Sequence, residues 1–579
     1  MIDCKQRSQK ILQDKATVNG AEAILLSFIE EGVDTLFGYP GGAIMPFYDT
    51  LYQYESCFRH VLTRHEQGAI HAAQGYARVT RKTGVCLTTS GPGATNILTG
   101  IADAYMDSTP LIVITGQVVS HLVGTDAFQE TDILTMSMAV TKWNTQITNA
   151  DDIPAVMAKA FYIANSGRPG PVLIDFPKDV FSTQLPFNYE SCDSLQTYKP
   201  NYTPFPEQVD KAARWINTAN TPLLLFGQGV VLSQAEEELK SFVERSGMPA
   251  AATLLGLSAL PASHPLYVGM LGMHGNYAPN LMTGEADLVI AIGMRFDDRV
   301  TGTVATYLKN SRIIHIDIDP TELGKNMDTD LEIEADAKSF LQSILPLIVE
   351  KKYPDWIKKF DEKYAEENSV VIQGDIHPTS GKPQMGEVIR MISQKADPQS
   401  VVITDVGQHQ MKVARYYPLN TPRTLVTSGG LGTMGFGLPA AIGAQLGRPN
   451  DTVIVFVGDG GMQMTMQEMM TIHQEKLPVK IVILNNEFLG MVRQWQELFF
   501  DGRYSATRLQ NPDFVKMAEA CWIKGQKVTK REELDDAINE MLNIDEPYLL
   551  EVMVEKEANV FPMVPPGAAV TDMILTRDK

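Results

Sequence analysis

The sequence lacks any stretch long and apolar enough to span a membrane, and its N-terminus lacks the hydrophobic run of a secretory signal. Residues 1–7 (Met-Ile-Asp-Cys-Lys-Gln-Arg) also do not resemble an organellar transit peptide. We therefore expect a soluble protein of bacterial type, located in the cytoplasm and without a membrane partner.

Cysteine is scarce. The five cysteines, at positions 4, 57, 86, 192 and 521, form no CxxC pair and no even framework. This pattern predicts reduced core or surface thiols in a cytosolic-type compartment. Nothing in the pattern supports a catalytic thiol.

Positive charge is also in short supply. Lys and Arg number 49 against 69 Asp and Glu, which gives a net charge of −20 and a pI near 5.0. This balance argues against nucleic acid or an anionic membrane as a partner. An anionic ligand would need a local site in which backbone dipoles or a metal ion reverse the field.

The sequence has no GxxxxGK[ST] phosphate loop, which argues against a P-loop nucleotidase. Residues 430–435 (Gly-Leu-Gly-Thr-Met-Gly) do match GxGxxG, a pattern typical of dinucleotide-binding sheets. The preceding run, residues 425–427, is a poor strand, although Asp459 ends the next one. A dehydrogenase stays open as a minor alternative at this point.

Buried-strand and helix patterns alternate along most of the chain, and about 150 residues per domain suggests three or four domains. Continuous apolar runs such as residues 111–115, 172–176, 223–226, 288–292 and 313–318 are typical of buried parallel strands. The expected fold is α/β, with three doubly wound parallel-sheet domains. We place them at residues 17–188, 205–348 and 380–556, followed by a proline-rich tail at 557–579.

Two polar segments follow neighbouring strands in the third expected domain, residues 380–556. Residues 453–457 and 479–484 read as buried strands, with a helix expected between them at 465–475. Asp459 follows the first strand and Asn486 the second, 27 positions apart (486 − 459). Because both strands of a βαβ unit point the same way, the two side chains should emerge on one edge of the sheet. One carboxylate and one amide oxygen predict a magnesium site that leaves positions for a diphosphate.

Other motifs have ordinary readings beside functional ones. Glu66 could be a solvated residue at a helix start or an acid buried against a ring nitrogen. The Gly-rich segment 90–96 could be a tight turn or an anion cradle. Arg168 suits a surface ion pair, whereas Asp317 resembles an acidic strand end that contacts a nucleotide. Residues 491, 495 and 499 form an apolar helical stripe, with core packing as its default role and a substrate-side wall as the sharper one.

Taken together, the motifs resemble the large catalytic subunit of acetohydroxyacid synthase (acetolactate synthase), a family of thiamine diphosphate enzymes. The resemblance runs from about residue 17 to 574. It rests on residues 39–42 (Tyr-Pro-Gly-Gly), 64–68 (Arg-His-Glu-Gln-Gly), 90–96 (Ser-Gly-Pro-Gly-Ala-Thr-Asn), 128–130 (Phe-Gln-Glu), 168–171 (Arg-Pro-Gly-Pro), 295–299 (Arg-Phe-Asp-Asp-Arg), 458–460 (Gly-Asp-Gly), 485–486 (Asn-Asn), 491–495 (Met-Val-Arg-Gln-Trp) and 562–567 (Pro-Met-Val-Pro-Pro-Gly).

The resemblance implies roles for individual residues. Asp459 and Asn486, with the main-chain carbonyl of Phe488, should bind Mg²⁺ and through it the diphosphate. Glu66, supplied by the second copy of a dimer, should hydrogen-bond N1′ of the aminopyrimidine. Met434 should bend the cofactor, and the carbonyl of Gly432 should face its amino group, which displaces the dinucleotide reading. Further contacts to thiamine diphosphate are implied for Gly407, Gln408, His409, Gly460, Gly461, Gly490 and Met491.

The resemblance also implies a second cofactor and a substrate channel. FAD, with a structural role, should lie along Arg168, His274, Gly275, Gly293, Arg295, Asp317 and Asp336. Gly42, Gln129 and Lys178 should serve catalysis, and Phe128, Arg299 and Trp495 should line the substrate site. Val119 and Met294 depart from the family pattern, at a channel wall and near the flavin respectively.

The implied reaction is the decarboxylation of pyruvate and transfer of the remaining two-carbon unit to a second pyruvate or to 2-oxobutyrate, on the route to valine, leucine and isoleucine. The implied assembly is a homodimer or a dimer of dimers with shared active sites, bound by a regulatory small subunit. Two rivals stay open: another thiamine diphosphate enzyme such as a pyruvate oxidase, which uses FAD as a redox partner, and a catalytically silent flavin-binding paralogue.

Overall fold

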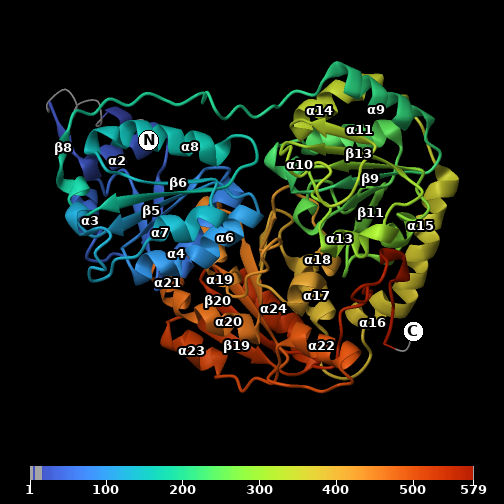
Figure 1. The fold of residues 1–579 in the computed structure, drawn as a ribbon. Coiled ribbons are helices and arrows are strands. Elements are labelled where there is room, and N and C mark those ends of the chain that lie inside the picture. Colours follow the sequence, from blue (N-terminus) through green and yellow to red (C-terminus); the bar gives the residue numbers. More distant parts are fainter. Residues whose placement is uncertain (1–3, 7–15, 578–579) are drawn as a thin grey trace.

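The computed structural model describes residues 4–6 and 16–577. Four residues of the N-terminal segment interpreted above (1–3 and 7) and the last two of the tail lie outside this range. Three sheets, each with six parallel strands, form three bodies that follow one another along the chain (Figure 1). The predicted fold class, α/β with three parallel-sheet domains, is confirmed.

The N-terminal sheet has the order β3-β2-β4-β5-β7-β6. Its strands are β2 (Thr35–Gly38), β3 (Arg59–Leu62), β4 (Gly84–Thr88), β5 (Leu111–Gln117), β6 (Trp143–Gln146) and β7 (Pro171–Pro177). Its helices are α2 (Gly20–Glu30), α3 (Met45–Tyr52), α4 (Glu66–Thr80), α5 (Pro92–Asn96), α6 (Leu98–Met106), α7 (Ile133–Ser137) and α8 (Ile153–Asn165). A short antiparallel pair, β1 (Val18–Asn19) with β8 (Gln184–Leu185), brings together the two ends of this body.

The central sheet has the order β11-β10-β9-β12-β13-β14. Its strands are β9 (Pro222–Phe226), β10 (Ala250–Ala252), β11 (Tyr267–Met270), β12 (Leu288–Ile292), β13 (Arg312–Asp317) and β14 (Leu331–Glu334). Its helices are α9 (Pro206–Thr218), α10 (Gln228–Leu232), α11 (Glu236–Ser246), α12 (Tyr277–Met282), α13 (Asp298–Thr301) and α14 (Ala337–Ile344).

The C-terminal sheet has the order β16-β15-β17-β18-β20-β19. Its strands are β15 (Val401–Thr404), β16 (Leu425–Thr427), β17 (Val453–Gly458), β18 (Lys480–Asn485), β19 (Lys524–Val528) and β20 (Tyr548–Met553). Its helices are α17 (Met385–Lys395), α18 (Gln408–Tyr416), α19 (Gly437–Gly447), α20 (Asp459–Thr465), α21 (Met469–Gln474), α22 (Gly490–Phe499), α23 (Phe514–Ala520) and α24 (Leu534–Asn543).

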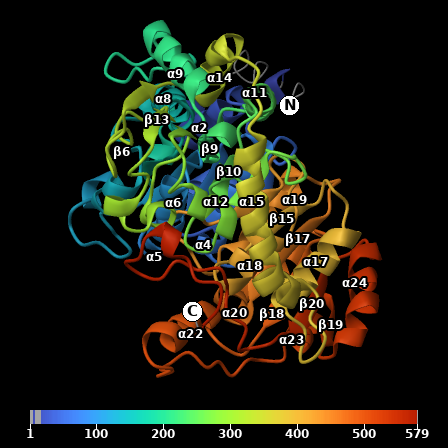
Figure 2. The ribbon, with the colours of Figure 1, turned by 90° about the vertical axis from the view of Figure 1, so that its right-hand side faces the viewer.

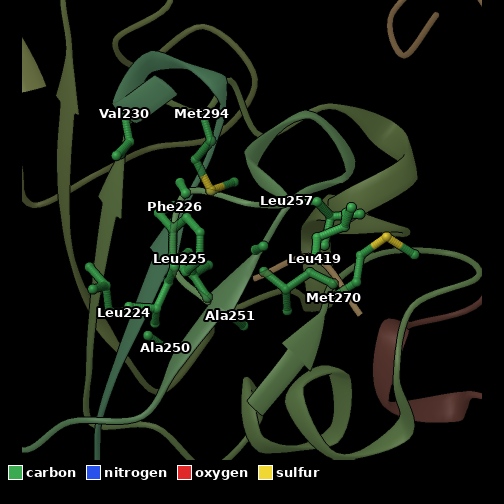
Figure 3. Packing of buried hydrophobic residues seen from close by; sticks show 14 of the residues in the cluster. Leu224, Leu225, Phe226, Val230, Ala250, Ala251, Leu257, Met270, Met294 and Leu419 are labelled. Carbon is green, nitrogen blue, oxygen red and sulfur yellow. The ribbon is translucent and has the colours of Figure 1, made fainter. Parts of the chain in front are cut away.

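The strands form where the sequence offers continuous apolar runs. All five residues of β9 and of β12 are buried, as expected of a sheet covered by helices on both faces. Figure 3 shows the packing around β9, where Leu224, Leu225 and Phe226 meet side chains of β10 and β11. Leu419, from the C-terminal body, lies beside Leu257 and Met270 in the same cluster, so the two bodies share a core.

The N-terminal and C-terminal bodies are joined by helices α4 and α19. Both are rich in small residues and pack so closely that a Cβ on Gly75 would overlap the carbonyl oxygen of Ala440, and a Cβ on Gly443 that of Ala72. One hydrophobic cluster runs through both sheets across this contact. The small residues of the helix that begins at Glu66 therefore allow the two bodies to approach closely.

Two segments connect the three bodies, and a tail follows the last one. Residues 186–205 run as an extended chain from the first body to the second (Figure 1), as expected of a linker. The connector after the central body is mostly helical: α15 (Pro354–Glu367), the π-helix η8 (Asn368–Ile372) and α16 (Gln373–Ile376) descend toward the C-terminal body (Figure 2). The tail is ordered, since Val560, Met563 and Val564 are buried and Met563 pairs with Ile574.

The expectation of reduced cysteines is wrong for two of the five, Cys4 and Cys57. Cys4 and Cys57 form a disulfide, with their Cα atoms 5.7 Å apart, although 53 positions separate them in sequence. No local pattern reveals such a contact, and the argument from cysteines to a reducing compartment loses its basis. The helix expected at residues 465–475 is present and is longer than expected: it begins at Asp459, directly after β17, and continues through a 3₁₀ turn to Gln474. Among the described residues, no helix is both long and apolar enough to cross a membrane.

Candidate functional site

Asp459 and Asn486 lie side by side at the carboxyl edge of the C-terminal sheet. Strands β17 and β18 are direct neighbours, with Gly458 opposite Leu484. Asp459 is the first residue of α20, and Asn486 follows β18 immediately. The two residues line a small cavity of about 30 Å³ together with Gly407, Gln408, His409, Met434, Gly460, Gly461, Phe488 and Gly490.

The polar groups of this cavity are buried and oriented. Burial raises the pKa of Asp459 to about 6, although the Asn511 amide donates to its Oδ2 at 2.7 Å. Asn486 Oδ1 accepts from the N–H of Phe488 at 3.1 Å. In the part of the chain that the structure describes, no group of three or more His, Cys, Asp or Glu could hold a metal. Asp459 is the one carboxylate among the described residues that line the cavity, so a cation bound there would keep charge to offer to a phosphate.

One observation supports a ligand bound next to these residues. His409 Nε2 is buried and has no hydrogen-bond partner among the described residues. A ligand in this cavity would supply the missing partner.

Asn511 is a site residue that sequence reasoning missed. Its Nδ2 lies 2.7 Å from Asp459 Oδ2 and 3.0 Å from Asn485 Oδ1, so it ties the ends of β17 and β18 together. It stands in an irregular segment before α23, and no pattern around it marks a function.

Asp405 holds the glycine-rich segment 430–437. Its carboxylate accepts from the N–H groups of Gly435 and Gly437, both at 2.9 Å, and burial raises its pKa to about 6. Gly432 and Gly435 have φ angles of 72° and 88°, which favour glycine. The dinucleotide alternative fails on topology: β15 lies between β16 and β17, so Asp459 does not end the strand next to the glycine segment.

A second, larger cavity of about 810 Å³ lies between the central and C-terminal bodies, and residues 106–108 and 167–169 of the N-terminal body complete its wall. It begins at the carboxyl ends of β12 and β13 and extends to the glycine segment and to α22. Of the residues expected at FAD, thiamine diphosphate or substrate, it is lined by Arg168, His274, Gly293, Arg295, Arg299, Asp317, Asp336, Gly407, Gly432, Met434, Met491 and Trp495. Gly275 is not among the lining residues, and its carbonyl accepts from Arg415 at 2.8 Å instead.

The polar groups of the larger cavity leave capacity for a ligand. His274 Nδ1 is buried and has no partner among the described residues, and burial lowers the pKa of its ring to about 3. Burial raises the pKa of Asp317 to about 7. Arg168 reaches Glu322 at 2.8 Å and Asp319 at 3.4 Å, so it is tied into the cavity wall and is not a free surface residue. The volume is within the range of sites that enclose large cofactors.

Met294 and two residues of the apolar stripe in α22 now have positions. The side chain of Met294 packs beside Phe226 and Val230 (Figure 3), and Met294 also lines the large cavity. In α22, the buried residues are Arg493, Gln494 and Glu497, whereas Met491 and Trp495 line the large cavity. The default reading of the apolar stripe as core is therefore wrong for these two residues.

The remaining predicted residues gather on the N-terminal body. Gly42, Glu66, Gln129 and Lys178 follow β2, β3, β5 and β7, so they share the carboxyl edge of one parallel sheet. Phe128, next to Gln129, is 88% exposed. Glu66 opens α4, and its Oε2 accepts from the Asn96 amide at 3.0 Å.

These five residues line neither of the two cavities. One chain thus carries two separate sets of candidate site residues. One set lies at the carboxyl edge of the N-terminal sheet, and the other lies on the central and C-terminal bodies, joined there by Arg168 of the N-terminal body. Those on the N-terminal sheet are largely exposed, apart from the half-buried Glu66.

Three family models match successive segments of the chain. Family models match residues 18–136 (Thiamine pyrophosphate enzyme, N-terminal TPP binding domain), 209–344 (central domain) and 405–552 (C-terminal TPP binding domain). The chain is 46% identical to the acetolactate synthase isozyme 2 large subunit of Escherichia coli, over 96% of this chain and 99% of that protein. It is 44% identical to the acetolactate synthase large subunit of Lactococcus lactis, over 98% and 97%. It is also 44% identical to the probable acetolactate synthase large subunit of Methanocaldococcus jannaschii, over 96% and 95%.

Similarity at this level over nearly the full length of each protein, together with the three matching domains, establishes the family. The chain belongs to the acetolactate synthase large-subunit family of thiamine diphosphate enzymes.

Proposed function

We propose that this chain is the catalytic subunit of an acetolactate synthase. Two molecules of pyruvate would give 2-acetolactate and carbon dioxide, and pyruvate with 2-oxobutyrate would give 2-aceto-2-hydroxybutyrate, the first common step toward the branched-chain amino acids. The observation that carries the proposal is the adjacency of Asp459 and Asn486 at the edge of the sheet, within a chain that matches this family along its length.

The residues of the small cavity would hold thiamine diphosphate and Mg²⁺. Asp459, Asn486 and the carbonyl of Phe488 are the proposed oxygen ligands of the cation, and His409 and the N–H groups near Gly460 and Gly490 are proposed to face the diphosphate. When bound, this cofactor supplies a nucleophilic carbon and an electron sink for the loss of carbon dioxide from a 2-oxo acid.

Side chains of this protein would orient the cofactor and the second substrate and would control the proton on the pyrimidine ring. Glu66 is proposed to hold a proton against the pyrimidine ring, since a carboxylate at a ring nitrogen can keep the ring in the tautomer that accepts a proton. Met434 is proposed to support the bend of the cofactor. Trp495, Met491 and Arg299 line the cavity beyond it, where they would exclude water and contact the second 2-oxo acid.

The part of the larger cavity at the carboxyl ends of β12 and β13 is proposed to hold FAD. The proposed contacts are Arg168, His274, Arg295 and Asp317. Because the proposed reaction has no net electron transfer, the flavin would serve the structure of the site. The unpartnered His274 Nδ1 and the volume of about 810 Å³ support a large polar ligand here.

The separation of Glu66 from the two cavities supports a dimer with shared sites. In a symmetric dimer, the exposed edge of one N-terminal sheet can meet the cavities of the other copy, and the reverse contact follows by symmetry. The relatives are named large subunits, and a regulatory small subunit is part of the proposal.

Product analysis tests the function. Purified protein with thiamine diphosphate, Mg²⁺ and FAD is given pyruvate alone and then pyruvate with 2-oxobutyrate. We expect 2-acetolactate in the first case and a mixture with 2-aceto-2-hydroxybutyrate in the second, both without air. Turnover that requires an external electron acceptor would instead identify a pyruvate oxidase, and no turnover would support a silent flavin-binding protein.

A further inference from the structure

Glu468 is a buried carboxylate of the C-terminal body that contacts the N-terminal body. It ends the 3₁₀ turn η9 (Met466–Glu468), which continues α20 from Asp459. Its two oxygens accept from the N–H of Arg64 at 3.0 and 3.1 Å, and the carboxylate also accepts from the N–H of His65. Thr471, in the following helix, donates to Oε2 at 2.7 Å.

The backbone that Glu468 holds leads directly into Glu66. Arg64 and His65 are the two residues before α4, and Glu66 is its first residue. Gly68, one turn into the helix, leaves the space that the carboxylate occupies, because a Cβ there would overlap Glu468 Oε1. A carboxylate in this position also interacts favourably with the N-terminal end of the helix.

Other contacts join the same two segments but do not reach Glu66. Arg59 forms an ion pair with Glu475 at 3.0 Å, and Arg64 Nη2 donates to Gln474 at 2.9 Å. These would fasten the bodies even without Glu468. The carboxylate of Glu468 is distinct in that it binds main-chain donors immediately before Glu66, at a buried position.

We propose that Glu468 is a positioning residue for Glu66: by fixing the backbone of Arg64 and His65, it sets where the Glu66 carboxyl stands in the active site. This inference rests on the proposed function, in which Glu66 works on the cofactor. The segment from Asp459 to Glu468 would then have two roles. Asp459 at its start would bind the cation, and Glu468 at its end would position Glu66.

The test compares Glu468→Gln with Glu475→Gln, which makes the same chemical change at the same junction without touching residues 64–66. Gly68→Ala is a second perturbation that displaces the carboxylate while Glu468 stays in place. Hydrogen–deuterium exchange of the peptide containing residues 62–68 is measured first, in the cofactor-free protein. We expect faster exchange in Glu468→Gln and Gly68→Ala, and wild-type exchange in Glu475→Gln.

Kinetics then separate positioning from general stability. We expect kcat for acetolactate formation to fall about 10- to 100-fold in Glu468→Gln, with KM for pyruvate and the affinity for thiamine diphosphate changed less than about 2-fold. In a Glu66→Gln background, Glu468→Gln should cause almost no further loss, because both changes act on the same group.

Three results would overturn the proposal: unchanged exchange at residues 62–68, unchanged kcat, or full multiplication of the two losses in the double variant. If Glu468→Gln does not fold, Gly68→Ala decides by the same criteria. Failure of the wild-type protein to form acetolactate would count against the proposed function, whereas the exchange result would still report on the hold of Glu468 over this segment.

Discussion

The ion pair between Glu367 and Arg415 offers a direct test of how the connector stabilises the cofactor cavities. Glu367 is the last residue of α15, Arg415 lies in α18, and both side chains are 0% exposed. Glu367 also accepts from the N–H of Tyr277 at 2.8 Å and from the Asn276 amide at 3.2 Å, while Arg415 donates to the carbonyl of Gly275 at 2.8 Å. Connector, central body and C-terminal body therefore meet at one pair of charges beside His274.

Replacing Glu367 by Gln should destabilise the protein strongly. The amide can still accept from Tyr277, but the buried guanidinium of Arg415 loses its counter-charge and keeps only neutral acceptors, the carbonyls of Gly275 at 2.8 Å and His274 at 3.5 Å. Removal of one partner from a fully buried pair costs about 3–5 kcal/mol. The large cavity should loosen at His274 and Gly275, so bound FAD should be retained less well.

The assay is urea-induced unfolding of the cofactor-free protein, followed by circular dichroism, with FAD retention measured separately by gel filtration. Because a chain of several domains need not unfold in two states, the first transition is compared between variants. Glu362→Gln is the matched control: it makes the same change on the same helix, in an ion pair whose side chains are 64% and 74% exposed, and should cost at most about 1 kcal/mol. Equal unfolding of the two variants would refute the reasoning.

Three further predictions concern the site and the junction between bodies. Glu66→Gln should lower kcat about 10²- to 10⁴-fold, with magnesium-dependent cofactor binding kept and stability changed by about 1 kcal/mol or less, as measured by steady-state kinetics and thermal unfolding; unchanged turnover would contradict its role. His71 is buried between α4 and α19, and burial lowers the pKa of its ring to about 3, below the value of about 6.5 in the unfolded chain. Because the unfolded chain therefore takes up the proton first, the free energy of unfolding is highest above about pH 6.5 and declines as pH falls. Lowering the pH from 7.5 to 5.5 should therefore cost about 1.4 kcal/mol through His71 alone, and urea titrations should show a smaller pH effect in His71→Gln; an equal effect would rule this out. Trp495→Leu should reduce the share of 2-aceto-2-hydroxybutyrate formed from mixed substrates while pyruvate turnover persists, and an unchanged product ratio would remove Trp495 from the acceptor site.

Much of the sheet architecture could be predicted because buried parallel strands are continuous apolar runs. Residues 288–292 coincide with β12, the strand expected at 453–457 is one residue shorter than β17, and the strand expected at 479–484 is displaced by one residue from β18. The adjacency of Asp459 and Asn486 followed from the same logic, since neighbouring parallel strands end at one edge.

The features that could not be predicted depend on contacts between distant segments. Asn511 reaches Asp459 from 52 positions away, and Glu468 reaches Arg64 across 404 positions. The disulfide of Cys4 and Cys57 and the pair of Glu367 and Arg415 are likewise products of the packed fold. Local propensity carries no information on which polar side chain a folded chain brings to a given backbone donor.

In the proposed dimer, acetolactate forms at a site built by two copies of this chain, with Glu66 from one copy and Asp459 from the other. The most direct measurement uses a mixed dimer of Glu66→Gln and Asp459→Asn chains, carrying different affinity tags and purified through both. Each parent dimer should be nearly inactive, whereas the mixed dimer has one intact site and one doubly altered site, so it should form acetolactate at about half the wild-type rate. If Glu66 and Asp459 of a site belonged to one chain, both sites of the mixed dimer would be damaged, and an inactive mixed dimer would contradict the account.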